Sequence, residues 1–138
     1  MRIATWNVNS LRSRIERVTG WLERHDVDVL AIQETKCRDD QFPGAELTSI
    51  GYEYAHVGLN QWNGVAIISR VGLTDVDTSF SADQPTYEEV LEPRAVGASC
   101  GGIRMWSLYV PNGRELDHPH YAYKLDWLAK LRAAGASW

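Results

Sequence analysis

Three apolar, strand-like segments of the chain end on polar side chains of the kinds that bind metal ions and phosphates. They are RIATWNV (2–8), DVLAI (28–32) and IRMWSLYV (103–110). In open α/β sheets, ligands bind outside the carboxyl ends of the strands, so the residues at these ends are the first candidates for a site. The candidates are Asn7 and Asn9 after the first segment, Gln33, Glu34 and Lys36 after the second, and Tyr109 and Asn112 at the third.

Glu34 is the strongest metal candidate. If its carboxylate converges with the amide oxygen of Asn7, the pair suits Mg²⁺ or Mn²⁺, because these hard cations take one or two carboxylates and keep several waters. From spacing alone, Glu34 could instead be a solvated loop residue or the partner of a helix terminus. Asn7 and Asn9 could instead cap the helix that follows them.

Spacing alone does not assign a single role to three further residues. Lys36 could lie near a phosphate or pair with Glu34, and it could also be an ordinary surface lysine. Arg94, which follows Pro93, could contact a phosphate, although an anchoring contact with a buried carboxylate is favoured. Tyr109 lies between apolar residues, a pattern that favours a core tyrosine with a hydrogen-bonded hydroxyl.

The remaining motifs exclude several classes of site. The pair His118-x-His120 lacks a third nearby ligand, so zinc binding is not expected and the histidines are predicted to lie on the surface or in loops. Trp62 could stack on nucleic acid, but a packing role is favoured. The P-loop, dinucleotide-binding and serine-hydrolase motifs are absent.

The first half of the chain predicts a strand–helix–strand opening. Apolar residues recur at helical spacing between the segments 2–8 and 28–32, and a second, weaker helix is expected from Pro43 to Ile50. The residues that define the first helix are Leu11, Ile15, Val18 and Leu22. A nearly continuous apolar strand such as 28–32 is expected to be covered on both faces.

The second half is richer in strands. Segments 52–57, 64–69 and 73–80 are predicted to pair in sequence, the segment 81–93 is predicted to be a loop, and Gly101-Gly102 is predicted to form a tight hairpin. The last helix is defined by apolar residues at Tyr121, Leu125, Leu128 and Leu131. This mixed order of strands and helices indicates an α/β or α+β layered fold.

Composition sets outer limits on the protein. The chain has 138 residues and is 44% hydrophobic, which is enough for one globular domain. No segment approaches the ~20 apolar residues of a membrane span and no signal peptide is visible, so we expect a cytoplasmic protein without a membrane partner. The two cysteines suggest neither a disulfide nor a zinc site. A net charge of −4 argues against bulk coating of nucleic acid, but not against a local basic groove.

Four motifs in register resemble the exonuclease III class of apurinic/apyrimidinic (AP) endonucleases, within the endonuclease/exonuclease/phosphatase superfamily. VDVLAIQETK is similar to the Asp-apolar-apolar-x-apolar-Gln-Glu-x-Lys signature of that class. TWNVNSLR, NGVAIISR and SLYVPNG follow in the order of the family. The resemblance runs from Met1 to the end of the chain, and the early start of the first strand is similar to the bacterial enzymes.

The resemblance implies a four-layer α/β-β/α sandwich with mainly antiparallel sheets, built from two similar halves. It implies Mg²⁺-dependent hydrolysis of phosphodiester bonds in double-stranded DNA, 5′ to abasic sites and at 3′ ends. By position in the motifs, Glu34 resembles the metal-binding glutamate, Asn7 the asparagine beside it, and Tyr109 the active-site tyrosine. Asn9 stands where relatives carry Asn or Asp, and Asn112 lies in the loop after the tyrosine.

One part of the family pattern has no counterpart in these residues. In the family, a Gly-Asp-x-Asn motif, a further aspartate and a closing Ser-Asp-His lie in the second half of the chain, and none of them matches a residue here. We therefore expect residues 1–138 to be the N-terminal portion of a single domain, nearly inactive alone, with a monomeric full-length parent. The alternatives are a phosphodiesterase of inositol phosphates or lipids, and a non-catalytic DNA- or protein-binding module.

Overall fold

A parallel pair of strands opens the fold. In the computed structural model, which describes residues 1–138, β1 (Ile3–Asn7) lies parallel to β2 (Val29–Gln33), with Asn7 opposite Gln33. The connection between them is a short 3-10 turn, η1 (Arg12–Arg14), followed by α1 (Ile15–His25). Parallel strands need such a crossover, and the predicted strand–helix–strand opening is confirmed.

The first sheet has four strands in the order β1-β2-β4-β3. Strands β3 (Glu53–Val57) and β4 (Val65–Ser69) are antiparallel, as predicted, and all five residues of β4 are buried. The short helices η2 (Asp39–Gln41) and α2 (Gly44–Ser49) connect β2 to β3, and α2 falls within the predicted weaker helix. The central β4 therefore has a neighbouring strand on each side and side chains packed on both faces.

The second sheet has three antiparallel strands in the order β5-β6-β7. They are β5 (Thr74–Asp77), β6 (Ala95–Cys100) and β7 (Ile103–Leu108). The hairpin between β6 and β7 turns at Gly101 and Gly102, with φ of +56° and +81°, a backbone that glycine adopts without steric cost. The predicted tight hairpin is confirmed.

The predicted pairing of the segment 73–80 with its predecessor is wrong. After Ser69 the chain leaves the first sheet, so β5 pairs with β6 in the second sheet, and its four residues are exposed. The apolar residues that suggested a longer strand belong to two different cores: Leu73 packs between the sheets and Phe80 packs on the outer side of the second sheet.

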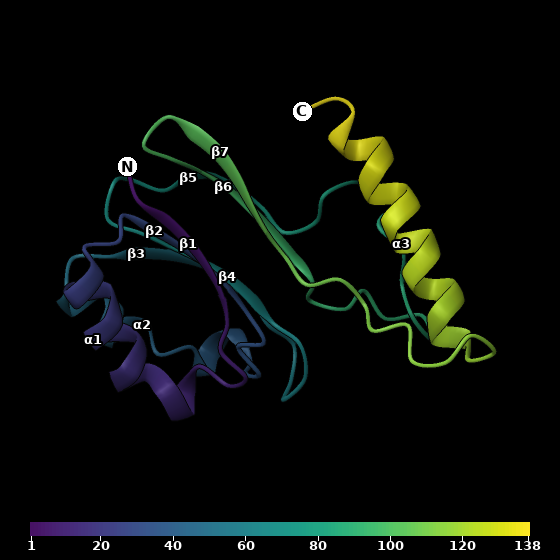
Figure 1. Cartoon of the computed structure of the whole chain (residues 1–138), viewed down its shortest axis with the longest axis horizontal. Helices are drawn as coiled ribbons and strands as arrows, with labels where there is room; N and C mark the ends of the chain where they lie inside the picture. The colour runs from purple at the N-terminus through teal and green to yellow at the C-terminus, as the bar shows by residue number, and fades with distance from the viewer.

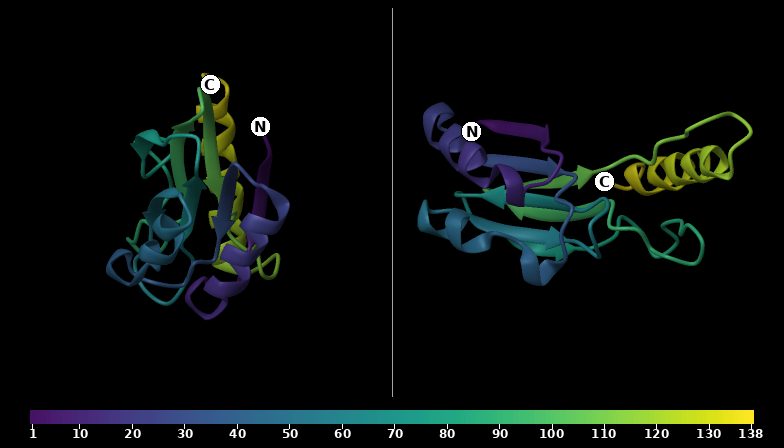
Figure 2. Two further views of the ribbon diagram at one scale, coloured as in Figure 1. Left: turned by 90° about the vertical axis from the view of Figure 1, so that its left-hand side faces the viewer. Right: turned by 90° about the horizontal axis from the view of Figure 1, so that it is seen from below.

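The elements stack as four layers with three hydrophobic clusters between them. Helices α1 and α2 cover the outer face of the first sheet, the two sheets face each other, and α3 (Pro119–Gly135) packs beyond the second sheet (Figures 1 and 2). The expected layered α/β fold with mainly antiparallel sheets is confirmed. None of the helices has the length and apolar content needed to cross a bilayer.

The buried side of α3 differs from the predicted one. His120, Tyr123 and Trp127 face the protein, whereas Leu125 is 50% exposed. The prediction failed because α3 is apolar on more than one side, so leucine spacing did not identify its inner face. The inner face is selected by the large aromatic side chain of Trp127, whose ring meets that of Phe80 edge to face at 5.1 Å between centroids.

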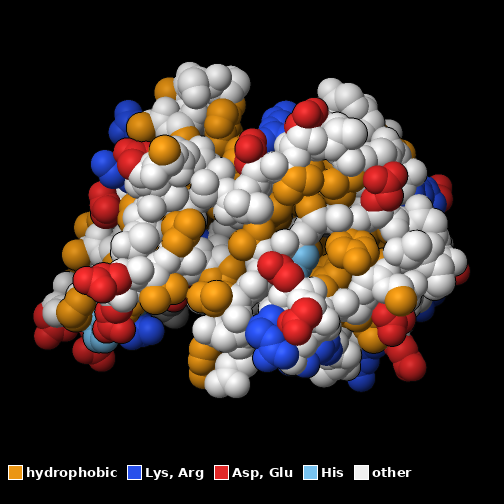
Figure 3. All heavy atoms as spheres, turned by 180° about the vertical axis from the view of Figure 1, so that it is seen from behind, with side chains coloured by type: hydrophobic (Ala, Val, Ile, Leu, Met, Phe, Trp, Pro, Cys, Tyr) orange, Lys and Arg blue, Asp and Glu red, His pale blue; other side chains and the backbone are white.

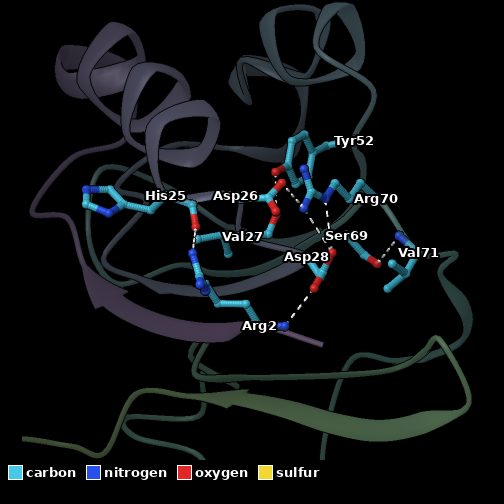
Figure 4. Close-up of polar contacts among 9 residues, drawn as sticks. All are labelled: Arg2, His25, Asp26, Val27, Asp28, Tyr52, Ser69, Arg70 and Val71. Carbon is cyan, nitrogen blue, oxygen red and sulfur yellow. Dashed lines mark hydrogen bonds and ion pairs between the residues drawn. The ribbon is translucent and has the colours of Figure 1, made fainter.

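A cluster of charges braces the end of the first sheet where β1 and β2 begin. The Arg70 guanidinium lies 2.6 Å from an Asp26 oxygen and 3.1 Å from an Asp28 oxygen (Figure 4). The backbone N–H of Arg2 donates to the other Asp28 oxygen at 2.6 Å, and this bond is the main cause of the lowered pKa of Asp28. These contacts tie the starts of β1 and β2 to the end of β4, away from the polar strand ends.

The sandwich is open along one side, between the free edges of β1 and β7. A cleft of about 450 Å³ lies there, and the side chains that line it are mostly apolar. They are Ile3, Ala4, Thr5, Ala31, Gln33, Met105, Trp106 and Leu108. Hydrophobic side chains also reach the surface in several patches on the face opposite to that of Figure 1 (Figure 3).

We expect the isolated 138-residue chain to self-associate through this open side, because unpaired strand edges beside apolar surface favour pairing between molecules. Sedimentation velocity over a wide concentration range should show dimers or larger species. Ile3→Lys on the β1 edge should reduce association, while Leu125→Lys on α3 should leave it unchanged. A cooperative monomer at every concentration would contradict the prediction.

The register of α3 gives a second prediction. Trp127→Ala should lower the free energy of unfolding by about 3–5 kcal/mol, since it empties a fully buried aromatic site. Leu125→Ala, on the exposed side of the same helix, should change it by only about 0.5 kcal/mol. Urea denaturation of both variants measures the two values, and equal losses would show that the register of α3 is different.

Candidate active site

The site is formed where strands from the two sheets end side by side. Glu34 directly follows β2 in the first sheet, and Tyr109 directly follows β7 in the second. The Tyr109 hydroxyl donates a hydrogen bond to Glu34 Oε1 at 2.6 Å, joining residues 75 positions apart. Two of the three predicted strand ends are therefore brought into direct contact.

Tyr109 is held as a hydrogen-bond donor. Its backbone N–H bonds to the Arg94 carbonyl at 2.8 Å, which continues the β6–β7 ladder by one residue. Burial, together with the bond to Glu34, raises the pKa of Tyr109 to about 12. The hydroxyl therefore stays protonated at neutral pH and can donate to a carboxylate or to a phosphate oxygen.

Glu34 and Lys36 flank a turn with an unusual backbone. Their φ values are +59° and +53°, in the left-handed region that non-glycine residues rarely adopt. Four backbone hydrogen bonds hold this turn: Ser10 N–H and Leu11 N–H donate into it, and its own N–H groups donate to the carbonyls of Asn63 and Gly64. A Cβ on Gly64 would lie 2.0 Å from Thr35 Oγ1, so the close approach requires glycine.

Asn7 and Asn9 do not cap a helix. Neither η1 nor α1 has a side-chain cap, which removes the capping interpretation for both residues. Asn7 Oδ1 accepts the Asn9 N–H at 3.2 Å, and Asn9 Oδ1 accepts a hydrogen bond from Lys36 Nζ at 2.7 Å. Lys36 thus pairs with Asn9 and links the end of β1 to the turn after β2.

Arg94 lies behind Tyr109 and is only 4% exposed. Its Nε donates to Glu92 at 3.0 Å, another guanidinium nitrogen donates to the Tyr109 carbonyl at 3.2 Å, and the guanidinium lies 4.9 Å from the centre of the Tyr109 ring. Glu92 also accepts a hydrogen bond from the Asn63 side chain at 3.2 Å. This geometry is that of an anchor, and a phosphate contact would require Arg94 to leave these partners.

Beside this anchor is a groove of about 350 Å³ whose lining includes Trp62 and Arg114. Trp62 is 61% exposed, so the expected packing role is wrong. Asn112 Oδ1 accepts the Arg114 N–H at 2.8 Å, which orders the loop after β7. The loop thus presents Arg114 to the groove, while Asn112 has a structural partner.

Two of the four histidines are buried, contrary to the expectation of surface or loop positions. The side chain of His56, on β3, is 3% exposed, and His120, at the start of α3, is also 3% exposed. His56 Nε2 lies 2.7 Å from Thr35 Oγ1, inside the Glu34–Lys36 turn. This contact could not be predicted from sequence patterns, because the two residues lie on different elements 21 positions apart.

The donor atoms fit a hard divalent cation better than zinc. Glu34 supplies a carboxylate, and Asn7 supplies an amide oxygen at the end of the neighbouring strand. The chain has no group of three or more His, Cys, Asp and Glu side chains that could hold a metal ion. One carboxylate with an amide oxygen suits Mg²⁺ or Mn²⁺, which complete their coordination with water and substrate oxygens.

Comparison with known proteins assigns the chain to a family. Residues 4–137 match the model of the Endonuclease/Exonuclease/phosphatase family, and the chain belongs to that family. The similar proteins within the family include exonucleases and AP endonucleases, which confirms the resemblance indicated by the motifs.

Three relatives illustrate the match. Exodeoxyribonuclease III of Haemophilus influenzae is 25% identical over 118 residues, covering 86% of this chain and 44% of that protein. An AP endonuclease from Archaeoglobus fulgidus is 42% identical with a TM-score of 0.84, covering 95% of this chain and 49% of that one. The 3′ phosphatase NExo from Neisseria, bound to a product DNA hairpin, is 37% identical with a TM-score of 0.86, covering 95% and 49%. The chain spans about half the length of these relatives.

The buried histidine predicts a pH dependence of stability. Burial lowers the pKa of His56 from 6.5 to about 4 in the folded protein. The unfolded chain therefore binds the proton first as the pH falls, and the free energy of unfolding should decrease between pH 6.5 and about 4. The two pKa values correspond to a loss of at most about 3 kcal/mol.

Urea denaturation at a series of pH values checks this prediction by comparing wild type with His56→Phe. The difference between the two in unfolding free energy should shrink as the pH falls through this range, because only the wild type loses stability by protonating His56. His25→Phe, at an exposed position of α1, is the matched control and should run parallel to wild type. A difference independent of pH would show that His56 titrates normally.

Proposed function

We propose that this chain is the N-terminal half of an exonuclease III-type DNA repair nuclease. The observation that carries the proposal is the Tyr109–Glu34 hydrogen bond of 2.6 Å, because it brings together the two motif residues that resemble the family's tyrosine and metal-binding glutamate. The named activities of the relatives support the same assignment.

The proposed substrate is double-stranded DNA with abasic sites or 3′ ends. One similar protein is named an AP endonuclease, and another is a 3′ phosphatase solved with a product DNA hairpin. Trp62 and Arg114 line an open groove beside Tyr109's anchor, so an aromatic face and a cation are available to nucleic acid there. Local contacts of this kind explain how a chain of net charge −4 could hold DNA.

Glu34 and Asn7 would hold the Mg²⁺ or Mn²⁺ ion. When bound, the ion neutralises charge on the phosphate and polarises a P–O bond, which can supply several kcal/mol. Tyr109, protonated at neutral pH, is placed to donate a hydrogen bond to a phosphate oxygen. Lys36, fixed on Asn9, adds a positive charge beside the two asparagines.

The water-orienting aspartate of the family pattern, in Gly-Asp-x-Asn, and its closing histidine, in Ser-Asp-His, have no counterpart among these residues. We infer that this chain supplies one wall of the active site and that the isolated 138-residue chain turns over DNA at close to the background rate.

The test is Mg²⁺-dependent cleavage of an abasic-site duplex by the full-length parent and by the 138-residue chain. The parent should cleave, EDTA should abolish cleavage, and Glu34→Gln should lower kcat about 100-fold or more. Tyr109→Phe should lower it by about 10-fold or more, because one hydrogen-bond donor is lost. Glu46→Gln, at an exposed position of α2, is the control and should match wild type.

Three outcomes would change the proposal. Robust cleavage by the 138-residue chain would show that its active site is complete. Hydrolysis of an inositol phosphate, but not of abasic DNA, by the parent would assign it to the other phosphodiesterases of the superfamily. DNA or protein binding by the parent without any hydrolysis would indicate a non-catalytic module.

A further inference from the structure

A chain of three polar side chains lies directly behind the turn that carries Glu34 and Lys36; it is buried at Thr35 and His56 and open to solvent at Asp39. It begins at Thr35, the residue between them, which has no exposed surface. Thr35 Oγ1 lies 2.7 Å from His56 Nε2, and His56 Nδ1 lies 2.8 Å from Asp39 Oδ1. The order Asp39–His56–Thr35 joins the turn after β2, the strand β3 and the short helix η2.

The arrangement resembles a nucleophile–histidine–carboxylate triad, but its chemistry is excluded by burial. A nucleophile must reach substrate, whereas Thr35 is fully enclosed and its hydroxyl faces the backbone of Gly64. The His56–Asp39 contact is also mainly electrostatic, because Nδ1 has no well-directed hydrogen-bond partner. The three residues therefore stabilise the turn and do not react with a substrate.

The protonation of His56 follows from its surroundings. Burial lowers its pKa to about 4, so the ring is neutral at pH 7. Asp39 faces Nδ1, which favours the proton on that nitrogen and leaves Nε2 free to accept from the Thr35 hydroxyl. The direction of the chain is then defined: Thr35 donates to His56, and the protonated nitrogen of His56 faces Asp39.

The position of the His56 ring is fixed from several sides. The Phe42 ring lies against it with 4.4 Å between centroids, and a Cβ on Gly58 would come within 2.4 Å of the ring. The Gly58 N–H donates to Asp39 Oδ1 at 3.0 Å, so the carboxylate is held by the same loop. His56 thus offers Thr35 an acceptor with little freedom to move.

We propose that Asp39, His56 and Thr35 form a positioning relay that holds Glu34 and Lys36 in their left-handed backbone conformation. Both conformations are unfavourable for residues with a side chain, so other contacts must hold them. Backbone hydrogen bonds reach all three residues of the turn, and the relay adds a contact that fixes the Thr35 side chain. The inference deepens the proposed function, because Glu34 is the metal-binding residue in that function.

The first experiment measures the turn itself, without metal or substrate. Hydrogen exchange read by mass spectrometry on peptides covering residues 33–38 should accelerate about 10-fold in Thr35→Val and His56→Phe, because the N–H groups of Thr35 and Lys36 lose protection. His56→Phe keeps a ring against Phe42, and Thr35→Val keeps the branched shape. Thr35→Ser, which retains the hydroxyl, should stay close to wild type.

The second experiment measures Mn²⁺ affinity of the 138-residue chain by electron paramagnetic resonance. Loss of a group that orients a metal ligand typically weakens metal affinity 10–100-fold, and this range is expected for Thr35→Val and His56→Phe. Thr35→Ser should bind within about threefold of wild type. His25→Phe, far from the turn, should match wild type in both experiments.

The outcomes separate the relay from the proposed function. If wild type fails to bind Mn²⁺ while exchange accelerates in the two variants, the relay stands and the metal role of Glu34 fails. If both variants keep wild-type exchange and wild-type affinity, the relay is overturned. If His56→Phe does not fold, the Thr35→Val and Thr35→Ser pair decides, and equal behaviour of these two variants would overturn the relay.

Discussion

The left-handed turn at Glu34 and Lys36 is the constraint on which the candidate site depends. It lies at the end of the parallel β1–β2 pair, between the loop that leaves β1 and the loop that enters β4. Both neighbouring loops donate or accept its backbone hydrogen bonds, so neither can move without disturbing the turn. Gly64 and the buried hydroxyl of Thr35 are also in close contact, because a Cβ on Gly64 would overlap Thr35 Oγ1. The loop that enters β4 is therefore packed directly against the turn. The backbone conformation of the turn therefore determines where the side chains of Glu34 and Lys36 lie.

The charged groups at the two ends of the first sheet have different partners. At one end, Arg70 and Asp28 bind the strand starts together with paired charges, which are partly open to solvent and satisfy each other. At the other end, Glu34, Asn7 and Lys36 gather on one side, with a carboxylate whose partner is a tyrosine hydroxyl. Placing the balanced charges at one end leaves the other free for groups whose partners can change when a ligand binds. In open α/β sheets, ligands bind outside the carboxyl ends of the strands, which is the end where Glu34 and Asn7 lie.

Much of this arrangement could be predicted from the sequence, and the failures have physical causes. Local patterns predicted β1, α1, β2 and the Gly101-Gly102 hairpin, because periodicity and turn residues act over short distances. The family motifs identified Glu34 and Tyr109, which spacing alone could not join. The inner face of α3, the sheet to which β5 belongs and the buried position of His56 depend on contacts between distant segments. The exposed position of Trp62 differs from the expected packing role, because large aromatic side chains usually pack inside and the sequence pattern around Trp62 does not show that no core lies beside it.

The contact between Glu34 and Tyr109 also makes the interior of the sandwich part of the site. Glu34 extends from one sheet and Tyr109 from the other, so their separation is a measure of how far apart the sheets lie. That spacing is set by a core of small and medium side chains, including Ala55, Val65 and Ala98. A bulkier residue at any of these positions would push the two sheets apart. The Tyr109 hydroxyl would then move away from the Glu34 carboxylate that accepts its hydrogen bond. Residues with no polar atom in their side chains thereby determine whether this half-buried polar pair can form.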